Sequence, residues 1–150
     1  MPRCSSDDSK PIFPDAPRNP DKARLLQLVN EARAQSRTCE LDLLVSAPPL
    51  AWSETLAAVA QLHCEDMEAA GRLSHRGTNG SFLDERLEQE GYTALVWAEN
   101  LAIGVETEME VVEEWLNSPG HCENIMLPDV LEMGVATSGP YWTMILAARD

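Results

Sequence analysis

Basic residues are scarce in this chain. Only 11 Lys and Arg stand against 25 Asp and Glu among its 150 residues, which gives a formal net charge of −14. The few Lys and Arg form no cluster that would offset this charge locally. A surface this acidic repels the phosphates of nucleic acids and the headgroups of anionic lipids. We therefore expect no nucleic-acid partner.

Long apolar runs are missing as well. No stretch approaches the roughly 20 apolar residues that a transmembrane helix needs, and the N-terminus, which begins Met-Pro-Arg, lacks the apolar core of a signal peptide. We expect no transmembrane segment and no export signal within this chain. Its 150 residues suit one domain, which can bury about two thirds of its unfolded surface without requiring a metal or a disulfide.

The first 20 residues offer little apolar surface to support folding. Serine and aspartate alternate there with half of the ten prolines of the chain, namely Pro2, Pro11, Pro14, Pro17 and Pro20. Such a composition predicts a disordered tail over residues 1–20, followed by one domain over residues 21–150. Cys4 lies in this tail without a lipobox before it, which favours an unpaired thiol.

Capping residues predict where four helices begin. Each precedes an apolar stripe at three- and four-residue spacing, and two of them are followed by an acidic residue that completes a capping box. The predicted N-caps are Asn19 before Pro20, Ser53, Ser81 with Asp84, and Thr107 with Glu110. The helix that starts after Ser53 ends at Gly71, and the one that starts after Ser81 ends at Gly91.

Strand signals are fewer than helix signals. Apolar, β-branched and aromatic residues concentrate over residues 98–103, 133–137 and 141–147. The last two runs are separated by Ser138-Gly139-Pro140 and predict a hairpin. Helices therefore dominate a mixed α+β chain.

The most informative segment is W-L-N-S-P-G-H-C-E-N-I at residues 115–125. Ser118 can cap a helix, Pro119 fits its first turn, and Gly120 lets the backbone pass close to another group. His121 then lies at the start of that helix, where the free amides disfavour the imidazolium. The neutral ring would be available as a ligand or a base.

Three further motifs accompany this segment. They are L-S-H-R-G at 73–77, E-G-Y at 90–92 and A-E-N-L-A-I-G at 98–104. In this order and spacing the four motifs resemble the CAP superfamily of cysteine-rich secretory, antigen 5 and pathogenesis-related 1 proteins, and most closely its bacterial SCP-like branch. The resemblance covers roughly residues 24–149. It implies a three-layer α/β/α sandwich in which a small antiparallel sheet lies between helical layers.

The same resemblance predicts which residues form the functional site. By this resemblance His75 and His121 are the two histidines of the family's cleft, and Glu99 is its carboxylate. The three residues are 24 and 22 positions apart in sequence, a spacing that matches no metal-binding motif. Two imidazoles, one carboxylate and a water could hold zinc or another divalent metal weakly. His63 lies on the apolar face of a predicted helix and is expected to be structural.

Four cysteines allow several disulfide pairings, which the sequence does not rank. The resemblance pairs Cys39 with Cys122, and a persistent disulfide implies a secreted or periplasmic protein. Cys64, beside an apolar stripe, is expected to be a buried free thiol. The alternative is a cytosolic protein with all its cysteines reduced.

Two functional classes remain open. The first is a secreted, non-catalytic binding module whose cleft accepts a divalent metal and a small apolar molecule or peptide. The second is a metal- or glutamate-assisted hydrolase, a peptidase, in which Glu99 would be catalytic. We favour binding, because the chain offers Glu99 and a helix start but no evident partner for either. It also lacks a convincing nucleophile, since Ser118 is assigned to capping and Cys122 to a disulfide.

Overall fold

A four-stranded sheet forms the centre of the protein, whose computed structural model describes residues 13–150. Its strand order is β3-β5-β6-β4. The strands are β3 (Ala51–Trp52), β4 (Ala94–Ile103), β5 (Glu132–Ser138) and β6 (Tyr141–Arg149). The pairs β5–β6 and β6–β4 are antiparallel, and the short edge strand β3 runs parallel to β5. The sheet is therefore mixed at one edge, where a wholly antiparallel sheet was expected.

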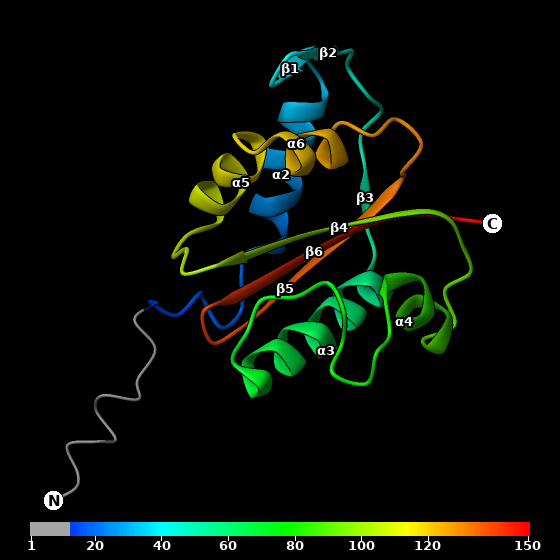
Figure 1. Cartoon of the computed structure of the whole chain (residues 1–150). Helices are drawn as coiled ribbons and strands as arrows, with labels where there is room; N and C mark the ends of the chain where they lie inside the picture. The colour runs from blue at the N-terminus through cyan, green and yellow to red at the C-terminus, as the bar shows by residue number, and fades with distance from the viewer. Residues whose placement is uncertain (1–12) are drawn as a thin grey trace, which may run out of the picture.

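Helices cover both faces of this sheet (Figure 1). One layer holds α2 (Lys22–Arg33), α5 (Glu108–Leu116) and α6 (Pro119–Ile125), and the other holds α3 (Glu54–Ala70) and α4 (Leu83–Gln89). A separate hairpin of β1 (Arg37–Cys39) and β2 (Asp42–Leu44) projects beyond α6. This arrangement confirms the expected α+β fold with three layers.

Two of the predicted helix starts are confirmed. The Ser53 hydroxyl accepts a hydrogen bond from the Leu56 amide at the start of α3, and the Thr107 hydroxyl accepts one from the Glu110 amide at the start of α5. Gly71 ends α3 with φ of 71°, a left-handed conformation that glycine adopts without strain.

The other two helices begin one or two residues later than predicted. Asp21, not Asn19, caps α2, because its carboxylate is the group that accepts from the Arg24 amide. Phe82, not Ser81, precedes α4, and Glu85 accepts from the Phe82 amide. The Ser81 hydroxyl instead donates to Asn79 in the preceding loop.

Strand prediction was less complete. The strand predicted at 98–103 begins at Ala94, whereas β5 and β6 confirm the predicted hairpin. The strands β1, β2 and β3 were missed because each has only two or three residues, too few to show an alternating pattern.

A large apolar core lies between the sheet and the α2–α5–α6 layer, and a smaller one lies on the α3–α4 side. Trp115 and Trp142 are almost completely buried, and their indoles donate to the backbone: Trp115 to the Leu101 carbonyl at 3.0 Å and Trp142 to the Val105 carbonyl at 2.8 Å. These bonds satisfy the polar atom of each ring and orient β4 and the loop that follows it.

The folded part of the chain includes residues 13–20, which were assigned to the disordered tail. The Ala16 amide donates to the Gly139 carbonyl at 2.9 Å, and the Thr137 hydroxyl donates to the Pro17 carbonyl. Proline and polar composition therefore did not prevent order, because this segment pairs with the β5–β6 turn. The rest of the predicted tail, residues 1–12, lies outside the described residues.

None of the helices within residues 13–150 combines the length and the apolar character that crossing a membrane requires.

Candidate functional site

A buried carboxylate lies at the centre of the candidate site. Glu99 belongs to β4, and its side chain is only 4% exposed. One carboxylate oxygen accepts from Nδ1 of His75 at 2.8 Å, and the other accepts from Nη1 of Arg86 at 3.0 Å. A second guanidinium nitrogen of Arg86 lies 3.4 Å from the first oxygen. Both oxygens of Glu99 are therefore engaged by side chains of the protein.

These contacts keep Glu99 charged. Burial alone would raise the pKa of this carboxyl group, but the hydrogen bonds from His75 and Arg86 and the positive charge of Arg86 together lower it by more. The net result is a pKa below its ordinary value. At neutral pH the group is therefore an ionised hydrogen-bond acceptor.

His75 lies between this carboxylate and solvent. Its backbone carbonyl accepts from Arg86 at 2.8 Å, and its side chain is 56% exposed. Because Nδ1 donates to the ionised Glu99, a neutral His75 ring carries its free electron pair on Nε2. A carboxylate behind one ring nitrogen orients the imidazole and makes its other nitrogen a stronger ligand.

His121 is the second histidine of the site, at the third position of α6. Asn100 of β4 donates to its backbone carbonyl at 3.1 Å, and Asn124 in turn donates to the Asn100 side chain at 2.9 Å. Burial is the main reason that the pKa of His121 is lowered, and electrostatic repulsion between the two imidazoles lowers it further while Glu114 opposes the shift. The ring is therefore neutral at pH 7.

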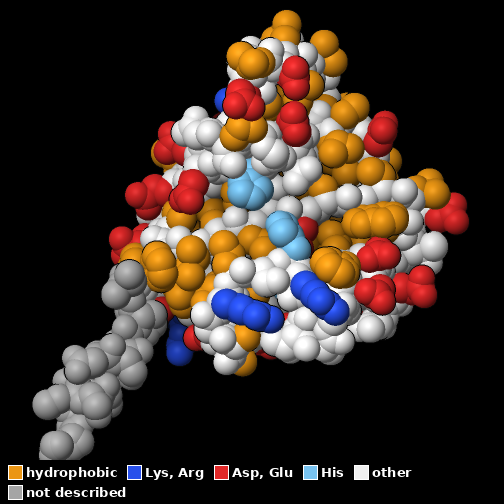
Figure 2. All heavy atoms as spheres, viewed as in Figure 1, with side chains coloured by type: hydrophobic (Ala, Val, Ile, Leu, Met, Phe, Trp, Pro, Cys, Tyr) orange, Lys and Arg blue, Asp and Glu red, His pale blue; other side chains and the backbone are white. Residues whose placement is uncertain are grey.

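The two histidines share one face of the molecule. Figure 2 shows two histidine side chains close together near the centre of this face, with apolar side chains on either side. His63, the third histidine, is only 1% exposed, and its Nε2 donates to the Ser74 carbonyl at 2.7 Å. The fold thus brings His75, Glu99 and His121 into one region, and it leaves His63 in the structural position that its sequence context predicted.

A disulfide anchors the His121 segment. Cys39 of β1 is bonded to Cys122 of α6, with 5.7 Å between their Cα atoms, which confirms the expected pairing. Cys64 is a buried free thiol, as expected, and burial raises its pKa to about 12. Ser118 precedes α6, but its hydroxyl makes no capping hydrogen bond, so its assignment as a side-chain cap was wrong. Cys4 lies outside the part of the chain that the structure describes.

Comparison with known proteins identifies the family. The family model described as CAP, the cysteine-rich secretory protein family, matches residues 26–141. The chain belongs to this family.

Relatives of this CAP domain include bacterial proteins. The chain is 37% identical over 98 residues to the uncharacterized protein YkwD of Bacillus subtilis, a match that covers 63% of the chain and 38% of YkwD. An extracellular protein containing an SCP domain from Bacillus anthracis has a similar structure, with a TM-score of 0.75, 24% identity, and coverage of 85% of this chain and 40% of that one.

An outer surface protein of Borrelia burgdorferi is also similar in structure. The TM-score is 0.74 at 22% identity, and the match covers 93% of this chain and all of that one. At these identities the two solved structures establish the fold. The chain spans about two fifths of the length of the two Bacillus proteins.

Arg86 belongs to the candidate site and was not predicted from the sequence. It lies on α4 three residues after Leu83 and one before Leu87, both of which are buried. That spacing places Arg86 on the inner face of the helix, so the signal was present in the helical pattern. The signal is weak, because Asp, Glu and Gln fill most of the other positions of α4, a composition typical of a surface helix.

The donor set of the site does not suit a metal with three protein ligands. Within residues 13–150 no group of three or more His, Cys, Asp or Glu side chains is arranged to hold a metal ion. Arg86 also places a positive charge directly against the carboxylate of Glu99, which opposes a second cation at that atom. The residues present therefore do not fit a three-ligand site that includes Glu99. The outward nitrogen of His75 and the neutral ring of His121 remain as donors.

Proposed function

We propose that this CAP domain is an exported, non-catalytic binding domain and that the surface around His75 and His121 is where its ligand binds. The observation that carries the proposal is the Arg86–Glu99–His75 chain of hydrogen bonds. It holds one imidazole in a defined orientation with its second nitrogen directed away from the carboxylate. A rigid, preoriented donor is what a binding site requires.

The same contacts argue against Glu99 as the general base of a hydrolase. A general base needs a free acceptor within reach of the proton that it removes, and Glu99 has both oxygens occupied. The cysteines within residues 13–150 offer no thiolate, since Cys39 and Cys122 form a disulfide and burial raises the pKa of Cys64 to about 12. The Ser118 hydroxyl is free of the capping role first assigned to it, but within residues 13–150 no hydrogen bond joins it to His75, Glu99 or His121, so it is not an activated nucleophile.

The ligand that we propose has two parts. A divalent metal such as zinc would bind the imidazoles of His75 and His121, while Glu99 acts as the partner that orients His75 rather than as a ligand. Two protein donors make such a site weak compared with the three or four of established zinc sites.

A small apolar molecule or a peptide would bind beside these imidazoles. Trp97 is two residues before Glu99 on β4, so both side chains point to the same face of the sheet, and Trp97 is 44% exposed. Phe82, at the start of α4, is 50% exposed. Exposed aromatic side chains next to oriented polar groups are typical of binding surfaces.

Export is the remaining part of the proposal. The Cys39–Cys122 disulfide supports it, because disulfides persist in oxidising compartments. The similar solved structures come from an extracellular protein and an outer surface protein, which is consistent with that location.

Calorimetric titration with zinc tests the metal part. The wild type should bind, and the His75→Ala/His121→Ala double variant should lose binding. Glu99→Gln, which keeps the shape of the side chain, should weaken binding by about 10- to 100-fold, as loss of an orienting partner does. Binding should also weaken below about pH 6, where imidazoles take up protons. Equal affinity in the wild type and the double variant would place the metal elsewhere.

A digestion assay tests the absence of catalysis. Purified protein, with and without zinc, is incubated with casein and a peptide library, alongside Glu99→Ala. We expect no turnover from any of the three samples. Cleavage that survives repurification and disappears in the Glu99 variant would establish the hydrolase interpretation instead.

A further inference from the structure

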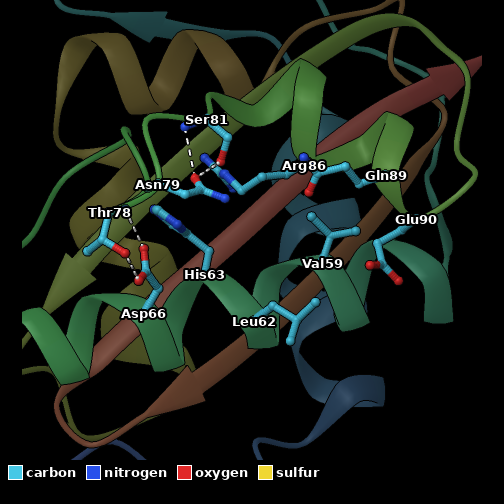
Figure 3. Close-up of a pocket in the computed structure, with 11 residues that line it drawn as sticks. Val59, Leu62, His63, Asp66, Thr78, Asn79, Ser81, Arg86, Gln89 and Glu90 are labelled. Atoms are coloured by element: carbon cyan, nitrogen blue, oxygen red, sulfur yellow. Dashed lines mark hydrogen bonds between the residues drawn. The ribbon is translucent and has the colours of Figure 1, made fainter.

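A cavity lies on the α3–α4 side of the sheet, and neither His75 nor His121 lines it. Its volume is about 220 Å³, and its walls come from α3, from the loop at residues 77–81 and from α4 (Figure 3). The apolar part of the wall is formed by Val59 and Leu62, and the polar part includes Asn79 and Ser81. Arg86 belongs both to this wall and to the hydrogen bonds around Glu99.

Two buried nitrogen atoms in this wall have no hydrogen-bond partner in the protein. They are Nδ1 of His63 and Nε of Arg86. His63 is 1% exposed and Arg86 is 9% exposed. In Figure 3 the two side chains reach into the same cavity, His63 from α3 and Arg86 from α4. Buried polar atoms almost always have a hydrogen-bond partner. Two unpaired nitrogen atoms at one cavity therefore indicate that a molecule binds there.

The hydrogen-bond roles of the two atoms are defined by their neighbours. Nε2 of His63 donates to the Ser74 carbonyl at 2.7 Å, so in the neutral ring Nδ1 is an acceptor. Burial lowers the pKa of His63, which keeps the ring neutral. The Nη atoms of Arg86 donate to Glu99 and to the His75 carbonyl, and Nε–H remains as a free donor. These two unpaired nitrogens are therefore one acceptor and one donor.

The charged side chains of the wall restrict the net charge that the ligand can carry. Asp66 and Glu90 contribute carboxylates to the wall, which disfavours an anion. A cation would meet the guanidinium of Arg86, so a neutral ligand fits best. The volume lies below the roughly 300–1,000 Å³ of sites for drug-sized molecules, which limits the ligand to about the size of a single ring.

We propose that this cavity binds two adjacent hydroxyl groups of a small neutral polyol or single sugar ring. One hydroxyl donates to Nδ1 of His63, and its neighbour accepts from Nε–H of Arg86. The carbon skeleton of the ligand lies against the apolar wall at Val59 and Leu62. The guanidinium of Arg86 also donates to Glu99 and to the His75 carbonyl. A ligand in the cavity would therefore contact the arginine that helps to position His75.

Two matched probes separate this proposal from simple hydration. The first is trans-1,2-cyclohexanediol, which carries the adjacent hydroxyls on a small ring. The second is cyclohexanol, which has the same ring and one hydroxyl. Each is titrated into the full chain labelled with ¹⁵N-histidine, and the ring nitrogen resonances of His63 are followed by NMR.

We expect the diol to shift Nδ1 of His63 saturably, with a Kd on the order of millimolar for a ligand this small. Cyclohexanol should bind about tenfold more weakly, because one of the two hydrogen bonds is lost. Equal affinity for the two probes, or a shift that grows linearly without saturation, would overturn the proposal and indicate a solvent-filled cavity.

An exposed position in the wall provides a variant that should fold normally. Leu62 is 54% exposed, so Leu62→Trp adds bulk at the cavity without disturbing the core. Leu131 is 53% exposed and does not line the cavity, so Leu131→Trp is the matched control. We expect Leu62→Trp to weaken diol binding at least tenfold and Leu131→Trp to leave it unchanged. Equal diol affinity in these two variants would place the binding elsewhere.

Discussion

Replacement of Arg86 by methionine would remove the group that compensates the buried charge of Glu99. The side chains of the two residues are 10% and 4% exposed. The variant loses the hydrogen bonds at 3.0 Å and 3.4 Å to Glu99 and the one at 2.8 Å to the His75 carbonyl. Methionine has a similar length and is apolar, so the change mainly deletes charge and hydrogen bonding.

The expected loss of stability is large. Removing one partner of a buried ion pair leaves an uncompensated buried charge and typically costs about 3–5 kcal/mol. A domain of this kind has a total stability of about 5–15 kcal/mol, so the variant should unfold at a much lower urea concentration. Lys22→Met is the matched control: Lys22 pairs with Glu54 at 2.7 Å, but both side chains are more than half exposed. The free energy of unfolding of Lys22→Met should fall by no more than about 1 kcal/mol.

The effect should also depend on pH. The folded-state pKa of Glu99 lies below its unfolded value of 4.5, so this group stabilises the wild type above about pH 4.5 and loses that contribution as pH falls through the folded pKa. In Arg86→Met the hydrogen bond from His75 still opposes the effect of burial but the contributions of Arg86 are lost, so the pKa of Glu99 should rise. The deficit of the variant should therefore be largest at neutral pH and shrink toward about pH 4.

Urea denaturation followed by tryptophan fluorescence and far-UV circular dichroism measures both quantities. Arg86→Met combined with Glu99→Gln should recover part of the lost stability at pH 7, because no unpaired charge stays buried. The reasoning would be refuted if Arg86→Met cost no more than Lys22→Met, or if its deficit were the same at pH 4 and pH 7.

Two further predictions concern the framework of the domain. Replacing both Cys39 and Cys122 by serine should lower the free energy of unfolding by about 2–5 kcal/mol. Peptide mapping of the oxidised wild type without reductant should recover the two linked peptides. Alkylation of both thiols in that sample would contradict the pairing. Gly134→Ala should destabilise the protein severely, because a Cβ there would lie 2.3 Å from the backbone nitrogen of Ala57 in α3. Thermal unfolding of that variant beside Gly120→Ala, where a Cβ meets nothing within 4 Å, is the check, and equal melting temperatures would refute the close contact.

Local hydrogen bonding explains what could be predicted about the helices. Ser53 and Thr107 cap their helices because a short hydroxyl side chain accepts from an amide three residues ahead, a contact that needs no partner from elsewhere in the chain. Asn19 is equally suited by type, yet Asp21 is the cap. Its backbone amide donates to Glu108, 87 residues away, and that contact is absent from the local sequence.

The candidate site, like the helix caps, was predicted in part from the sequence and was completed by contacts between distant residues. The motifs around His75, Glu99 and His121 indicated the family, and the family resemblance grouped the three residues. Neither indicated that Arg86 would hold both Glu99 and the His75 carbonyl. An arginine in a polar helix has no local feature that distinguishes a solvated side chain from one buried against a carboxylate.

By itself the sequence determined the class of the fold, the helix starts that depend on local capping, the β5–β6 hairpin and the residue types of the site. Tertiary structure decided which atoms of those residues are free. Packing of α4 against β4 pairs Glu99 with Arg86 and directs the second nitrogen of His75 away from them. Packing of α3 beside the same arginine leaves His63 and Arg86 each with one unpaired nitrogen in a shared cavity. Hydrogen bonds between residues distant in sequence exist only once the layers are assembled, and for that reason the local pattern could not specify them.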